Sequence, residues 1–167
     1  MQTGLLVVMV IYFCLQGVAY IQADPRYTFQ GTGCISPNPT DQDPIINYMQ
    51  QSHIRYAWAT GWLGDPITFK TNGALLVTER PGRIPVNSNT VLHADRPGIF
   101  FLVRSDNLHP TILHALDARN ITYHIERFYS EQGIDLLLVT PLNRTVSPLD
   151  PAFSKLFQNV FRGCLTQ

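Results

Sequence analysis

Short runs of apolar or alternating residues follow one another along most of the chain, and turn-forming residues separate them. The clearest runs are GIFFLVRSD from Gly98, NITYHIERFY from Asn120 and IDLLLVT from Ile134. Runs of this length that are rich in β-branched and aromatic residues are typical of β-strands. The pattern therefore predicts strands over 98–106, 120–129 and 134–140.

Weaker runs predict further strands before and between these three. HIRYAWAT (53–60), Thr90–His93 and HPTILHAL (109–116) each have the length of a strand. PITFKTNGALLVTE (66–79) has the form of a hairpin, because Asn72-Gly73 suits a two-residue type I′ turn. About seven or eight short strands in series predict an all-β fold, either an up-and-down antiparallel barrel or a sandwich.

One amphipathic helix is predicted near the end of the chain. Ser147 to Asp150 has the form of a capping box, Asp150-Pro151 offers an alternative start, and Gly163 supplies the C-terminal stop. A shorter helical turn is predicted to open at Pro44. The long helix should pack outside the sheet, because its apolar residues form one stripe that needs a surface to cover. This stripe consists of Leu149, Phe153, Leu156, Phe157, Val160 and Phe161.

The first residues predict a secretory signal peptide. The apolar run LLVVMVIYFCL extends from Leu5 to Leu15, and small residues follow it, so cleavage is expected after Ala19 or Ala23. A retained anchor is the alternative. We expect residues 1–23 to be removed and residues 24–167 to form one secreted, extracellular domain without a membrane span.

Composition and motifs exclude several functions. The 167 residues include 12 basic and 12 acidic side chains without a run of like charge, so no nucleic-acid partner is expected. The chain has no GxSxG, HExxH or phosphate-binding glycine motif, and its 5 histidines lack tight metal spacing. We therefore predict no enzyme activity, no catalytic residues, no cofactor and no metal.

Cysteines and sequons fit the predicted export. After cleavage Cys34 and Cys164 remain, and an oxidising compartment favours a disulfide between them; two free or intermolecular thiols are the alternative. Asn120 and Asn143 each begin an Asn-x-Thr triplet and are predicted glycosylation acceptors. The triplet at Asn38 is excluded by its proline.

The back half of the chain resembles the lipocalin family. IFFLVRSDNLHPTILHAL is similar to that family's strand–turn–strand pair, with Ser105-Asp106-Asn107 at the turn. ITYHIERFY and IDLLLVTPLNRTVSPLDPAFSKLFQNVF resemble its last two strands, loop and helix, so the resemblance covers about 99–164. It implies a closed up-and-down barrel with one C-terminal helix packed outside. Cys34 and Cys164 resemble the terminal disulfide of many lipocalins. The family's Gly-x-Trp signature is missing.

Two functions from different classes follow. The first is a carrier that binds a small hydrophobic molecule, such as a fatty acid, retinoid, sterol or pigment, in a barrel cavity. The second is a secreted β-rich glycoprotein that binds another protein, which predicts a filled core and an exposed apolar patch. Simple core packing is the alternative role for the residues expected to line the cavity. These residues are Tyr56, Trp58, Phe69, Phe101, Val103, Tyr123 and Ile125.

Overall fold

The computed structural model describes residues 9–18, 41–129, 133–163 and 165–166. The chain divides into two units, Met1–Gly31 and Thr32–Gln167. In the first unit, residues 9–18 form a helix. Among the described residues, no helix has both the length and the apolar character that crossing a membrane requires. The predicted cleavage sites, Cys34 and Cys164 lie outside the described residues, so the signal peptide and the disulfide stay predictions.

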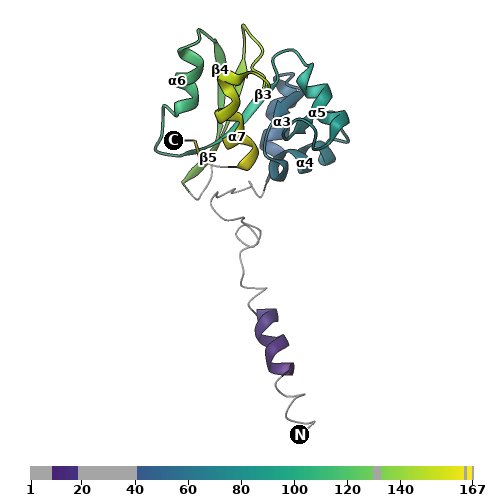
Figure 1. The fold of residues 1–167 in the computed structure, drawn as a ribbon. Coiled ribbons are helices and arrows are strands. Elements are labelled where there is room, and N and C mark those ends of the chain that lie inside the picture. Colours follow the sequence, from purple (N-terminus) through teal and green to yellow (C-terminus); the bar gives the residue numbers. More distant parts are fainter. Residues whose placement is uncertain (1–8, 19–40, 130–132, 164, 167) are drawn as a thin grey trace. The chain divides into compact units, whose positions relative to one another are not determined.

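The second unit is built on one open, mixed β-sheet (Figure 1). The strands lie in the order β2-β1-β3-β5-β4, and β6 pairs with β3 as well. β1 pairs in parallel with β2 and with β3, and β6 pairs in parallel with β3, whereas β5 is antiparallel to both β3 and β4. The strands are β1 (Tyr56–Trp58), β2 (Leu76–Thr78), β3 (Gly98–Arg104), β4 (Tyr123–Phe128), β5 (Ile134–Pro141) and β6 (Leu165–Thr166).

Helices connect the parallel strands and follow the others. One lies between β1 and β2, and another between β2 and β3, as parallel pairing requires, since a crossover must return the chain to the same end of the sheet. The helices are α3 (Asp43–Gln51), α4 (Gly61–Lys70), α5 (Pro85–Leu92), α6 (Thr111–Asp117) and α7 (Ser154–Arg162), with a 3₁₀ turn, η1 (Pro151–Phe153), before α7.

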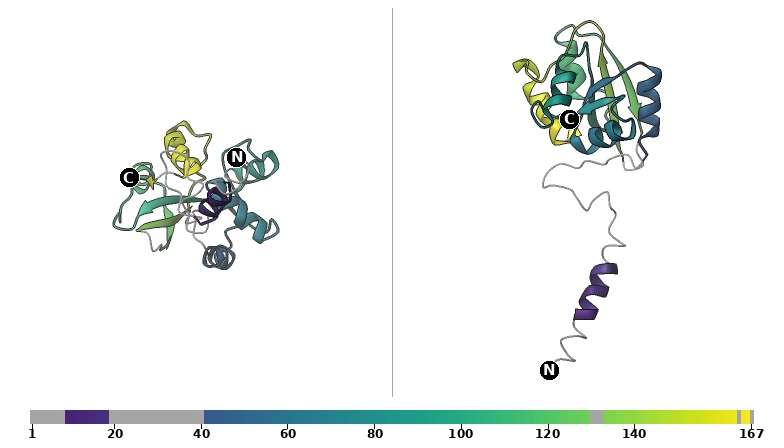
Figure 2. Two further views of the ribbon diagram at one scale, coloured as in Figure 1. Left: turned by 90° about the horizontal axis from the view of Figure 1, so that it is seen from below. Right: turned by 90° about the vertical axis from the view of Figure 1, so that its right-hand side faces the viewer.

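The sheet is buried on both faces, which gives the unit three layers. On one face, α5, α6, η1 and α7 pack against inward side chains of β3 and β5 such as Phe101 and Leu137. On the other, α3 and α4 pack against the alternate residues, such as Phe100 and Leu138. Figure 2 (right) shows the strands between α3 on one side and α7 on the other.

The prediction of an all-β barrel is therefore wrong. The strands do not close on themselves, and helices alternate with them. The physical reason is visible in β3 and β5, whose residues from Gly98 to Val103 and from Asp135 to Val139 are buried without a break. A barrel or sandwich strand alternates inward and outward residues, whereas a strand with helices on both faces is apolar at consecutive positions.

Three predicted strands are helices. HPTILHAL forms α6, Thr90–His93 lies mostly in α5, and the first arm of the hairpin at 66–79 belongs to α4. In α6 the buried residues Ile112, Leu113 and Leu116 have helical spacing. The rest of that hairpin was predicted well, since its second arm contains β2 and Asn72 and Gly73 at its turn both have positive φ (49° and 77°).

Four elements confirm their predictions. The strands at β3, β4 and β5 form, and α7 packs against the sheet. Asp150 caps η1, with its Oδ1 accepting from Ala152 N at 2.9 Å. Gly163 ends α7 in the left-handed conformation, with φ 63°, as the glycine stop requires. The turn at Pro44 is a full helix, α3.

Candidate functional site

The residues predicted to line a ligand cavity lie mainly in one layer of the core. Trp58, Phe101 and Val103 are buried there, and Tyr56, Tyr123 and Ile125 pack against them. Phe69 differs, because it lies on α4 and is 84% exposed. No barrel surrounds these side chains, so the cavity in which they were predicted to bind a ligand is not formed by a barrel. Their role as ligand contacts stays a prediction.

Helix α7 closes the face on which Trp58 lies. The Trp58 ring meets Phe157 and Phe161 edge-on, with ring centroids 6.2 and 6.0 Å apart. Trp58 is fully buried, and its indole Nε1 has no hydrogen-bond partner among the residues that the structure describes. Edge-to-face packing at these distances is a favourable aromatic contact. The aromatic residues of α7 therefore pack against Trp58, one of the residues predicted to line a ligand cavity, whereas Leu149 of the predicted stripe lies before η1 and is 64% exposed.

The topology of the sheet indicates a different candidate site, at the carboxyl ends of β1 and β2. Open α/β sheets bind ligands beyond the carboxyl ends of parallel strands, where successive connections diverge. Here the connection through α4 leads from β1 to β2, and the connection through α5 leads to β3 on the other side of β1. The residues that follow β1 and β2 at this edge are Ala59–Gly61 and Glu79–Arg83.

An ion-paired arginine covers this edge. Glu79 Oε2 accepts hydrogen bonds from Gly61 N at 3.1 Å and from Arg83 Nη1 at 2.7 Å. Arg83 Nη2 lies 3.2 Å from Asp65 Oδ2. A Cβ atom at position 61 would overlap the Arg83 guanidinium. Glycine at this position therefore lets the arginine lie across the start of α4.

This arrangement disfavours a phosphate ligand. The first amides of a helix usually form an anion site, but Glu79 already accepts from the Gly61 amide of α4. Asp65 adds a second carboxylate beside Arg83. A bound phosphate would have to displace Glu79 and approach Asp65, which costs electrostatic energy. The edge lacks the form of a nucleotide site.

Exposed apolar side chains stand next to members of this cluster in the sequence. Trp62 follows Gly61 and is 59% exposed, while Ile84 and Val86 are 40% and 77% exposed. Beside them an open groove of about 550 Å³ runs along α5 without a charged residue in its lining. We call Trp62, Arg83, Ile84, Val86 and this groove the α4–α5 surface. The groove is lined by Pro81, Gly82, Pro85, Val86, Ser88, Asn89, Thr90 and Leu92.

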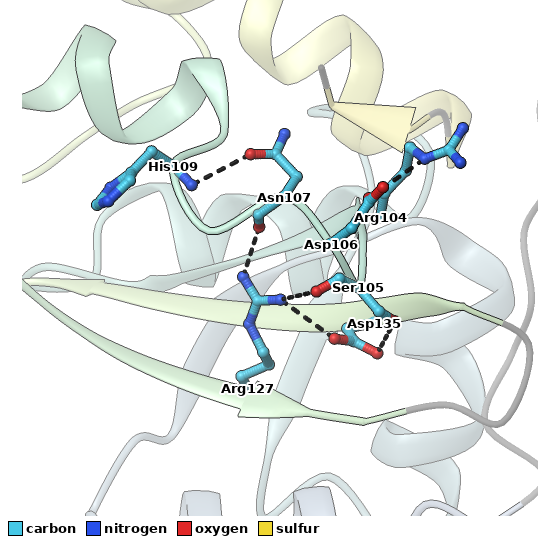
Figure 3. A network of polar contacts seen from close by, with 7 residues as sticks. All are labelled: Arg104, Ser105, Asp106, Asn107, His109, Arg127 and Asp135. Atoms are coloured by element: carbon cyan, nitrogen blue, oxygen red, sulfur yellow. Dashed lines mark hydrogen bonds and ion pairs between the residues drawn. The ribbon is translucent and has the colours of Figure 1, made fainter.

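A second polar network lies at the ends of β3, β4 and β5 (Figure 3). Asp135 is fully buried and accepts from Ser105 Oγ at 2.6 Å and from Arg127 Nη1 at 3.2 Å. Arg127 also donates to the backbone oxygens of Ser105 and Asn107, at 3.3 and 2.8 Å. His109 joins only through its backbone amide, which donates to Asn107 Oδ1. The network anchors the loop after β3.

A smaller depression of about 380 Å³ lies at the opposite edge of the parallel strands. Arg96 is among its lining residues, but its guanidinium already donates to Asp95 and to the Leu142 carbonyl. Its backbone also has positive φ, at 48°. Since these contacts engage the arginine within the protein, the depression offers a poorer ligand site than the α4–α5 surface.

Comparison with known proteins gives no match: no family model fits the chain, and no curated protein or solved structure resembles it. The lipocalin resemblance therefore stays a sequence-based prediction, and the fold that it implied is wrong. Among the described residues, no group of three or more His, Cys, Asp or Glu side chains could hold a metal ion.

Sequence reasoning missed the α4–α5 surface. Trp62 lies just beyond the strand predicted at 53–60 and was not among the predicted site residues, and Ile84 and Val86 were given no role. One signal was present: RPGRIPVN places two apolar residues among turn formers, where no core position would be expected. Trp62 is exposed because it lies in the first turn of α4, whose inward positions are Leu63 and Ile67.

Proposed function

We propose that the domain is exported and binds another protein through the α4–α5 surface. The observation that carries this proposal is the exposure of Trp62, Ile84 and Val86 around an ion-paired arginine, next to an uncharged groove. Aromatic side chains and arginine are enriched in protein interfaces, and charged residues are depleted at their centres.

The packing of the core supports the same choice. Both sheet faces are covered by helices, and six of the seven residues predicted to line a ligand cavity lie in one layer of the core, whereas Phe69 is exposed. A carrier would gain its affinity by burying an apolar molecule inside the protein. Here the accessible apolar area lies outside instead, where a partner protein can bury it.

A photo-crosslinking experiment tests this proposal. The purified chain carries a benzoylphenylalanine at Val86, or, as a control, at Gln158, which is exposed on α7, and is mixed with extracellular proteins of its native source. We expect discrete adducts from position 86 alone. Unlabelled wild-type protein should compete them away, whereas a Trp62→Ala/Arg83→Ala variant should compete at least tenfold less well, since such residues dominate interface energies.

Two results would contradict the proposal. Equal adducts from both positions would mean non-specific contact, and equal competition by the double variant would place binding elsewhere. The double variant is expected to fold, because both side chains are partly exposed and surface ion pairs contribute about 0–1 kcal/mol. Circular dichroism checks that it does.

A further inference from the structure

The two Asn-x-Thr triplets meet in the folded domain although 23 residues separate their asparagines. The pairing of β4 with β5 ends at Tyr123 and Pro141. Beyond it, Leu142 N donates to Thr122 O at 2.8 Å. The segment that contains the first triplet therefore runs beside the segment that opens the second.

Asn143 continues this pairing with its side chain. Its Oδ1 accepts from Thr122 N at 3.0 Å, and its Nδ2 donates to Asn120 O at 2.9 Å. The amide thus binds one backbone donor and one backbone acceptor, as a further strand residue would. Both groups would otherwise depend on water at the end of the ladder.

Asn120 is different. It is exposed, its φ is 53°, and within the described part of the chain its side-chain amide has no hydrogen-bond partner. Only its backbone oxygen takes part in the contact with Asn143. A group attached to the Asn120 side chain would extend into solvent and leave the ladder intact.

The chemistry of N-glycosylation separates the two sites. The sugar is transferred from a lipid-linked pyrophosphate donor: a bond forms between C1 and Nδ2, the C1–O bond to the pyrophosphate breaks, and one Nδ2 proton leaves. The product is a secondary amide, which is trans like a peptide bond. The sugar therefore lies on the same side of the C–N bond as Oδ1.

In Asn143 this position is occupied. The amide spans Asn120 O and Thr122 N, two groups on the same side of the neighbouring backbone. The N–H that donates to Asn120 O is consequently the one beside Oδ1, and a sugar would replace that hydrogen. A glycan on Asn143 and this pair of hydrogen bonds exclude each other.

We propose that the folded, exported protein carries its glycan on Asn120, while Asn143 stays unmodified and clamps the end of the β4–β5 ladder. The inference rests on the export proposed above. It does not depend on the α4–α5 surface, because Asn120 and Asn143 follow α6 and β5.

The test is glycan mapping of the full chain secreted from cultured insect cells. Release of glycans in ¹⁸O-water converts each modified asparagine to labelled aspartate. We expect the label at Asn120 and none at Asn143. Thr122→Ala should yield secreted protein without a glycan, whereas the matched variant Thr145→Ala should keep the wild-type glycan mass.

A stability measurement tests the clamp separately. In unglycosylated protein, Asn143→Asp keeps the Oδ acceptor and loses the Nδ2 donor, so Tm should fall by about 2–4 °C. Asn120→Asp should leave Tm within about 1 °C, as expected for a surface change.

The outcomes are distinguishable. Label at Asn143 in the secreted protein, or a secreted protein without any glycan, overturns the assignment. Equal Tm changes in the two Asn→Asp variants overturn the clamp. A chain that stays inside the cell with its leader attached overturns the export, and the stability measurement still decides whether Asn143 acts as a clamp.

Discussion

At the scale of single residues, buried charge distinguishes Asp135 from its neighbours. Its carboxylate is fully buried and holds Arg127, which is 15% exposed, whereas Asp106 pairs with Arg104 on an open surface at 76% and 71% exposure. We expect Asp135→Asn to lower the free energy of unfolding by about 3 kcal/mol, since it leaves an uncompensated guanidinium. Asp106→Asn should change it by less than about 1 kcal/mol. Urea unfolding of both variants measures the difference, and equal effects would refute it.

Tyr123 gives a residue-scale prediction about pH. Burial raises the pKa of its phenol above the usual value, and the hydrogen bond and charge of Asp117 raise this pKa further. Because the pKa of this phenol is higher in the folded than in the unfolded protein, its protonated form stabilises the fold at all pH values below the pKa of the unfolded chain, near 10. This stabilisation is lost as the pH rises through the pKa of the folded protein. Ultraviolet titration should show one late-titrating tyrosine in the wild type, and Tyr123→Phe should remove it. Asp117→Asn should lower this pKa while burial still keeps it raised, and an unchanged titration in that variant would contradict the contribution of Asp117.

At the scale of elements, α4 protects the outer edge of β2. The hydroxyl of Thr68 donates to Val77 O and accepts from Val77 N, both at 3.0 Å. An edge strand normally presents such groups to other chains. We expect Thr68→Val to cost about 1–3 kcal/mol, because both backbone groups lose their partner. The control is Thr90→Val, because Thr90 is an exposed residue of α5 whose hydroxyl donates to Val86 O within the same helix. This substitution should change the thermal unfolding temperature very little.

Element by element, the sequence predicted the strands whose apolar runs were longest. β3, β5 and α7 follow from their patterns, and Gly163 marks the helix end as expected. α4 and α5 could not be derived in the same way. α4 contains Pro66 and the β-branched Ile67 and Thr68, which local propensity assigns elsewhere, so burial against β2 decides its conformation.

At the scale of the whole molecule, burial separates the two tryptophans. Trp58 is fully buried and Trp62 is 59% exposed. In Trp62→Phe, the remaining emission should be blue-shifted and resist iodide quenching, whereas in Trp58→Phe it should be red-shifted and readily quenched. Because Phe157 and Phe161 pack directly against the Trp58 ring, fatty acids and retinoids should leave the Trp58 signal unchanged. Saturable quenching of Trp58 by an apolar molecule would instead support a carrier.

The overall architecture could not be predicted, because the covering of each strand is a property of the whole chain. The distinguishing signal was present in IFFLV and DLLLV, where consecutive residues are apolar and none is reserved for solvent. The candidate site could not be predicted from the sequence either, because Glu79 and Gly61 become neighbours only once β1 and β2 pair in parallel.

The strand order β3-β5-β4 has a consequence during synthesis. β4 leaves the ribosome before β5, yet β5 lies between β4 and the rest of the sheet. At about 5–20 residues per second, the nascent chain leaves β4, and the edge of β3 that later pairs with β5, without a partner strand until β5 has emerged. We expect ribosome-stalled chains ending inside the loop before Ile134 to recruit chaperones and to be cut quickly by added protease. Chains stalled on a C-terminal extension, so that α7 has emerged, should resist the protease. Equal protease sensitivity of the shorter and the longer chains would show that β4 is protected without β5.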